Sequence, residues 1–189
     1  MKPTDQLRQE HDIIKLALSI LAAICRRIEK KESVDDSHLD GLLTFIRLFV
    51  DQCHHGKEED FLFPAMEEAG FAKEGGLLCV MLMEHRMSYA LINGLAGAIR
   101  RFKKNEDGAA EKVVEFARGF INLLSEHIEK ENHSLFPMAE QALKGKREGE
   151  LMEDFNRLET VKIGRGKRRE FELFLDNLRE IYLNVRYDF

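Results

Sequence analysis

The sequence predicts an all-α protein: an up-down-up-down four-helix bundle followed by a C-terminal helical hairpin. Three observations support this fold class. Apolar residues recur at intervals of three and four along four long segments, which is the spacing of amphipathic helices. The chain contains only 3 prolines, and the runs of Val, Ile and Thr that are typical of strands are hard to find. The connections between the segments are short, which favours antiparallel neighbours.

The first two helices are predicted over residues 4–30 and 37–69. In the first, apolar side chains step along one face, and His11 occupies a position of that face where Leu or Ile would be expected. Residues 33–37, Ser-Val-Asp-Asp-Ser, form a polar break with good N-cap chemistry for the second helix. Gly70 is expected to end the second helix.

The third and fourth helices are predicted over residues 76–103 and 109–143, with a turn at 105–108 between them. Each again carries one apolar face.

Pro64 lies inside the second helix and should kink it or loosen its last turn, because proline cannot donate a backbone hydrogen bond. Pro137 lies late in the fourth helix.

The chain changes character after the fourth helix. Two shorter helices, over residues 147–161 and 167–182, are joined by a loop and are predicted to form a hairpin on the outside of the bundle. The predicted organisation is therefore a four-helix bundle at 1–143 and a C-terminal helical extension at 144–189.

The two halves of the bundle repeat one another at specific polar positions. In the second and fourth helices, a His is followed by Lys at the third position, Glu at the fourth and a Phe-Pro pair further on. The matching residues are His54 with His127, Lys57 with Lys130, Glu58 with Glu131, and Pro64 with Pro137. The first and third helices repeat more briefly, since Glu10-His11 matches Glu84-His85.

Residues four apart lie one turn apart on the same helix face, so four imidazoles and two carboxylates should converge inside the bundle. These are His11, His54, Glu58, His85, His127 and Glu131. Each unsatisfied buried polar group costs about 1–3 kcal/mol, and six would offset most of a typical stability of about 5–15 kcal/mol. Divalent metal ions resolve this conflict, since neutral imidazole and carboxylate are their usual ligands.

Two non-haem iron ions are the predicted occupants, each bound by two histidines and bridged by Glu58 and Glu131. Zinc or manganese could replace iron, because His/Glu sites accept several metals. A metal-free network of hydrogen-bonded His and Glu side chains is the alternative, and it requires every member to be satisfied.

Three neighbours of these residues are interpreted separately. His55 and Glu59 share the spacing of the motif but are rotated by one residue, so we expect them to flank the site, and Glu59 could assist binding. Tyr89 lies one turn beyond His85 and could face the metals, although a core tyrosine with a bonded hydroxyl group is the favoured interpretation.

Charge and composition exclude several classes of function. A net charge of -5 provides no general attraction for nucleic acid or for an anionic membrane. The basic run at 165–169 is interpreted as a solvated helix start in preference to a phosphate contact. The 3 cysteines form no CxxC motif, the N-terminus lacks an apolar leader, and no apolar run is long enough to span a membrane. We expect a cytoplasmic protein.

The paired His-x-x-x-Glu…Phe-Pro pattern in residues 1–143 resembles that of the hemerythrin-like, HHE cation-binding family. The resemblance implies a non-haem di-iron centre in a four-helix bundle, with the six residues named above as its ligands by position. The last two helices are also similar to an extension seen among bacterial members. The chain departs from the oxygen-carrying hemerythrins in one place: their third helix carries a His-x-x-x-His pair, whereas Tyr89 stands four residues after His85.

This departure implies more open metal positions and argues against simple reversible oxygen transport. The leading hypothesis is a protein that binds or senses oxygen, nitric oxide or iron and redox status. A di-iron oxidoreductase of the peroxidase, nitric oxide reductase or iron-sulfur repair type is the second, and a structural bundle with adventitious metal is the third. An electron-donor protein and a homodimer are the macromolecular partners that these hypotheses allow.

Overall fold

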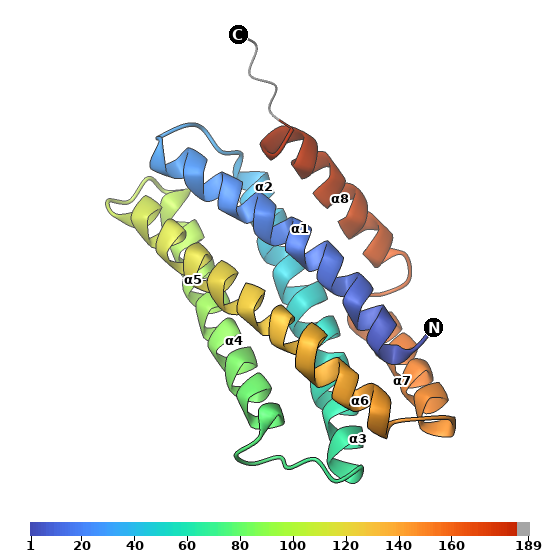
Figure 1. Cartoon of the computed structure of the whole chain (residues 1–189). Helices are drawn as coiled ribbons and strands as arrows, with labels where there is room; N and C mark the ends of the chain where they lie inside the picture. Colours follow the sequence, from blue (N-terminus) through green and yellow to red (C-terminus); the bar gives the residue numbers. More distant parts are fainter. Residues whose placement is uncertain (185–189) are drawn as a thin grey trace.

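The computed structural model describes residues 1–184 and is built from helical rods joined by short turns (Figure 1). The four rods of the bundle are α1 (Pro3–Glu29); α2 (Asp36–Phe45) continuing through η1 (Ile46–His55), η2 (Glu58–Leu62) and α3 (Phe63–Glu68); α4 (Leu77–Phe102); and α5 (Ala109–Lys130) continuing through η3 (Glu131–Leu135) and α6 (Phe136–Ala142). The hairpin consists of α7 (Lys146–Lys162) and α8 (Lys167–Tyr182). No strand occurs within residues 1–184, so the predicted fold class is confirmed.

The second and fourth rods differ from the uninterrupted α-helices that the periodicity predicts. The segments η1, η2 and η3 are π-helical, so they hold more residues in each turn than an α-helix does. Pro64 and Pro137 each lie within the first two positions of the α-helical segment that follows. Each proline removes one backbone N–H donor at the point where a π-helical turn passes into an α-helix. The rod continues past each proline. The π-helical segments overlap the two His-x-x-x-Glu motifs in part, since η1 contains His54, η2 begins at Glu58 and η3 begins at Glu131.

Two buried apolar clusters lie on either side of the level occupied by the candidate ligands. Along α1, Leu7 belongs to the smaller cluster, His11 follows one turn later, and Ile14 belongs to the larger cluster. The smaller cluster also contains Phe63 and Phe136, which flank the prolines. Polar side chains at this level are thus enclosed by packed hydrophobic layers.

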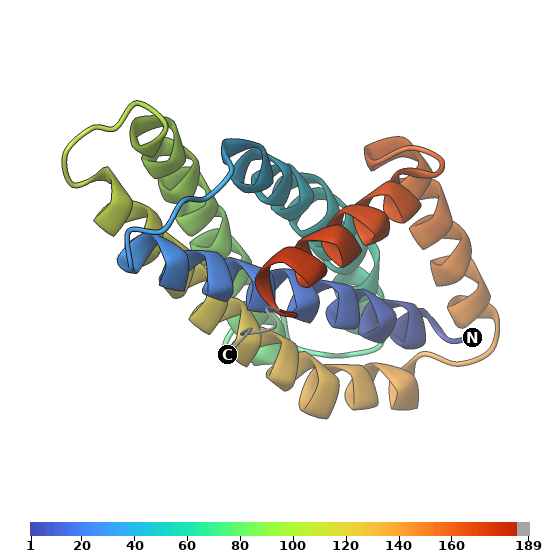
Figure 2. The same ribbon diagram turned by 90° about the horizontal axis from the view of Figure 1, so that it is seen from above.

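Helix α8 lies along α1 and α2, as Figure 2 shows from above. Helix α7 contacts α1, η1 and η2. Helix α8 contributes Phe171 and Leu178 to the larger apolar cluster, and α7 contributes Phe155 to the smaller one. A Cβ atom added at Gly41 would lie 2.3 Å from Cζ of Phe174, so α8 packs very closely against α2. The hairpin therefore shares the core of the bundle, while the division at residue 143 stays a prediction.

In the part of the chain that the structure describes, no helix is both long enough and apolar enough to cross a bilayer.

Candidate metal centre

The six side chains predicted from the repeat meet at one level of the bundle. Each is at most 4% exposed. They come from all four rods: His11 from α1, His54 and Glu58 from η1 and η2, His85 from α4, and His127 and Glu131 from α5 and η3. Their ligand atoms form two groups, one around His11 and His54 and one around His85 and His127, and both groups include the two glutamates.

The histidines face each other in two pairs. Nε2 of His11 lies 3.1 Å from Nε2 of His54, and Nε2 of His85 lies 3.1 Å from Nε2 of His127. Each pair joins an odd rod of the bundle to the next even rod. The internal repeat of the sequence is thus expressed as an approximate two-fold arrangement in space.

The two carboxylates lie between the pairs. Glu131 places Oε2 3.0 Å from Nε2 of His11 and Oε1 2.9 Å from Nε2 of His127. Glu58 places Oε1 3.9 Å from Nε2 of His54 and Oε2 3.4 Å from Nε2 of His85. Each glutamate therefore offers one oxygen to each half of the site, which is the arrangement that a carboxylate needs to bridge two cations.

The outer nitrogen of every one of these histidines has an acceptor. Nδ1 of His54 lies 2.9 Å from a carboxylate oxygen of Glu10, and Nδ1 of His127 lies 2.9 Å from one of Glu84. Nδ1 of His85 lies 2.6 Å from Oε1 of Glu59, and Nδ1 of His11 lies 2.9 Å from Oδ1 of Asn132. A neutral imidazole that donates from Nδ1 presents a lone pair at Nε2. If all four imidazoles are neutral and donate from Nδ1, as metal binding requires, all four lone pairs point toward the centre.

This arrangement fits divalent cations and is poorly satisfied by protein groups alone. In that protonation state the paired Nε2 atoms, 3.1 Å apart, present lone pairs to each other and do not attract. Within residues 1–184, both carboxylate oxygens of Glu58 and Oε1 of Glu131 are buried without a hydrogen-bond donor in good geometry. Buried polar atoms without partners are rare in folded proteins and call for an explanation. Two metal ions bound by the paired imidazoles and the shared carboxylates would satisfy all of these atoms.

The pKa values show how strongly the glutamates and histidines interact. Burial, helped by the charge of Glu131, raises the pKa of Glu58 well above its ordinary value. Burial would raise the pKa of Glu131 too, but the charge of His127 and the hydrogen bond from His11 hold it well below the usual range. Burial opposes charge on His127, yet Glu131 and Glu84 raise its pKa to about 9. A cation at the centre must compete with protons on Glu58 and His127.

Behind the first pair, a buried network of charged residues reaches the hairpin. The carboxylate of Glu10, which accepts from His54, also accepts from the fully buried Lys57. Lys57 donates to Glu159 of α7 over 2.7 Å, and Nη1 of Arg168 in α8 lies 3.4 Å from Glu10. Burial would raise the pKa of Glu10, but the hydrogen bond from His54 and the charge of Lys57 lower it to about 2. The basic run is therefore only partly solvated, contrary to the prediction.

Behind the second pair, the matching network is short and close to solvent. Glu84 accepts from His127 and from Lys130, as Glu10 does from His54 and Lys57. The side chain of Lys130 is 38% exposed, whereas that of Lys57 is 0% exposed. The hairpin covers only the first of the two networks.

Two of the neighbouring residues, Glu59 and Tyr89, lie near the surface. Glu59 is 43% exposed and supports His85 from outside, as a flanking residue should. Tyr89 is 56% exposed, so it neither faces the centre nor belongs to the core, and both interpretations of it are wrong.

His55 lies closer to the centre than the sequence suggests. It is buried, and its ring forms a third group of ligand atoms with His85 and His127, all within 4.8 Å of one another. The sequence carries a signal for this, because the matching position in the second half is Ile128, which is 0% exposed. An apolar residue at the matching position of the repeat therefore indicates that His55 is buried too.

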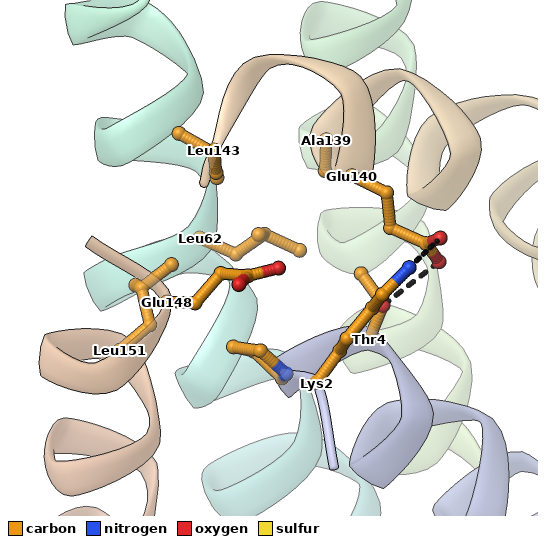
Figure 3. Close-up of a pocket in the computed structure, with 9 residues that line it drawn as sticks. Lys2, Thr4, Leu62, Ala139, Glu140, Leu143, Glu148 and Leu151 are labelled. Atoms are coloured by element: carbon orange, nitrogen blue, oxygen red, sulfur yellow. Dashed lines mark hydrogen bonds and ion pairs between the residues drawn. The ribbon is translucent and has the colours of Figure 1, made fainter. Parts of the chain in front are cut away.

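The hollow drawn in Figure 3 is a different feature, at the end of the bundle where α1 begins. Its lining includes Lys2, Thr4 and Glu140, and none of the six candidate ligands. Glu140 accepts hydrogen bonds from Nζ of Lys2 and Oγ1 of Thr4, both over 2.9 Å. These contacts attach α6 to the start of α1.

Comparison with known proteins agrees with this geometry. The family model for the hemerythrin HHE cation binding domain matches residues 2–139. An uncharacterized protein of Mycobacterium bovis and two of Mycobacterium tuberculosis are each 22% identical to this chain over 177 residues, covering 94% of it and 68% of the relative. No significant match to a solved structure was found. Since the family model covers more than half of the chain, the protein belongs to the hemerythrin HHE cation-binding family.

Proposed function

We propose that the protein is a non-haem di-iron protein that binds or senses a small diatomic molecule, oxygen or nitric oxide, or reports iron and redox status. The observation that supports this most is the pairing of four inward-facing Nε2 atoms around two shared carboxylates. Helical bundles with this combination of ligands are suited to pairs of iron ions. When bound, iron would supply redox chemistry and open coordination positions.

Enclosure of the centre favours a small ligand over an organic substrate. All six candidate ligands are at most 4% exposed, and they lie between two packed apolar clusters. A diatomic molecule can reach such a centre through small fluctuations of the packing, whereas a larger substrate would need a rearranged bundle. The enclosed centre therefore favours a small molecule. Binding or sensing is the leading function, with the di-iron oxidoreductase as the competing outcome.

The first test is the metal content of protein purified from iron-supplemented cells. It is combined with the near-ultraviolet and visible spectrum before and after reduction and exposure to oxygen. We expect two irons per chain and charge-transfer bands that respond to redox state. The reduced protein should bind oxygen or nitric oxide stoichiometrically and without turnover.

Two variants make this test specific. His54→Ala removes one candidate ligand and should lower the iron content, while His133→Ala, at a side chain that is 74% exposed, should leave it unchanged. Zinc that iron cannot replace, or a reduced protein that binds neither gas, would argue against the proposal. Steady turnover of peroxide or nitric oxide, lost in His54→Ala, would instead favour the oxidoreductase.

A further inference from the structure

His55 is a buried histidine that nothing in the described part of the protein satisfies. It is 1% exposed, and neither ring nitrogen has a hydrogen-bond partner among residues 1–184. The nearest carboxylate oxygen recorded for it, Oδ1 of Asp51, lies 4.0 Å from its Nδ1, beyond hydrogen-bond distance. In contrast, the outer nitrogens of the four paired histidines all have acceptors.

The ring of His55 lies against the second histidine pair. Its centroid is 4.0 Å from that of His85, with an angle of 16° between the planes, and 5.7 Å from that of His127. The ligand atoms of these three residues lie within 4.8 Å of one another. His55 is also the last residue of η1, where the π-helical turn places neighbouring residues closer together around the helix axis than an α-helix does.

The internal repeat provides a natural control for this position. The equivalent residue of the second half, Ile128, is equally buried and belongs to the larger apolar cluster. The fold can therefore fill this position with an apolar side chain. An unpaired imidazole in its place has no packing explanation, because burying a polar group without a partner is unfavourable.

We infer that His55 is a fifth histidine of the centre, a ligand of the metal ion held by His85 and His127. This inference rests on the proposed function, since it requires the two-metal centre. The two metal positions are then unequal: the ion at His85 and His127 has three imidazoles, and the ion at His11 and His54 has two.

The test compares the wild-type chain with His55→Ile, which introduces the residue found in the other half. Both proteins are loaded anaerobically with isotopically labelled ferrous iron and examined by Mössbauer spectroscopy and by metal titration. The wild type should show two distinct iron signals of equal area. In His55→Ile we expect the affinity for one iron to fall at least about tenfold. Mutation of a residue that only hydrogen-bonds to a metal ligand already lowers metal affinity by about 10–100-fold.

Folding and packing are controlled separately. The melting temperature of metal-free His55→Ile should be equal to or above that of the wild type. His55→Ala should lose the same iron and regain it when free imidazole is added, whereas Ile128→Ala should lower the melting temperature without changing either iron signal. If His55→Ile does not fold, the rescue of His55→Ala by imidazole decides the question.

Two results would overturn the inference in different ways. Unchanged iron affinities and unchanged signals in His55→Ile, or no rescue of His55→Ala, would show that His55 is not a ligand while leaving the di-iron centre intact. A wild type that binds no pair of irons would remove the proposed function itself.

Discussion

The first half of the bundle, α1 with the rod from α2 to α3, presents the same residues to the centre as the second half, α4 with the rod from α5 to α6. Their surroundings differ. In the first half, the ion pair behind the histidines is fully buried and connected to the hairpin, while in the second half it reaches solvent. One half carries His55 and Glu59 where the other carries Ile128 and Asn132. A duplicated ligand set can therefore hold two chemically different positions.

Removal of a shared carboxylate should have the largest effect, because it affects both halves. Glu131→Gln replaces an anion that faces His11 and His127 with a neutral amide. We expect the affinity for both metal ions to fall by at least about 100-fold. This is more than the loss expected when a residue that only hydrogen-bonds to a ligand is changed. The measurement is metal content by mass spectrometry after dialysis. Glu129→Gln, on the exposed side of the same rod, is the matched control. Loss of one ion alone would show that Glu131 serves only one half.

The two ion pairs behind the histidines should differ in their contribution to stability. Glu10→Gln leaves the fully buried Lys57 with Glu159 as its remaining anion, and should lower the free energy of unfolding by about 3 kcal/mol. Glu84→Gln affects the partly exposed Lys130 and the buried His127, and should cost less than Glu10→Gln, at about 1 kcal/mol. Urea denaturation of the metal-free proteins measures both. Equal losses would contradict the difference between the halves.

Docking of the hairpin against the first half should be sensitive to one methyl group. In Gly41→Ala, the new Cβ atom would lie 2.3 Å from the Phe174 ring, so we expect a loss of about 1–3 kcal/mol from overpacking. Gly149→Ala, in α7, meets nothing within 4 Å and should instead stabilise the protein by about 0.5–1 kcal/mol. Thermal unfolding of both variants gives the comparison. A neutral effect of Gly41→Ala would mean that α8 moves easily on α2.

A smaller effect is expected at acid pH from Glu140, which attaches the second half to the start of α1. Burial would raise the pKa of Glu140, but hydrogen bonds from Lys2, Arg8 and Thr4 lower it to about 2. Since the folded-state pKa is below the unfolded one, this stabilisation is complete above about pH 4.5 and is lost as the pH falls toward 2. After allowance for solvent screening it amounts to about 1 kcal/mol. Denaturant titrations between pH 6 and 2 should show that difference from Glu140→Gln above about pH 4.5, and its disappearance as the pH falls toward 2.

The sequence by itself determined the helices, their order and the six residues that meet. Apolar periodicity is a local property, and residues such as His54 and Glu58 share a helix face whatever surrounds them. The duplicated motif also predicted that the six side chains meet, because two copies of a helix pair pack as one bundle. For these reasons the predicted helices and the convergence of the six side chains agree with the structure.

Only the tertiary structure decided what surrounds each residue. Spacing alone predicted His55 beside the site and Tyr89 in the core or facing the metals. The π-helical turn and the packing of the rods instead put His55 inside and Tyr89 at the surface. The contact between Arg168 and Glu10 joins residues far apart in the chain, and no local pattern predicts it. Burial and long-range partners depend on how complete helices pack together, so they distinguish the two halves in a way that the repeat could not reveal.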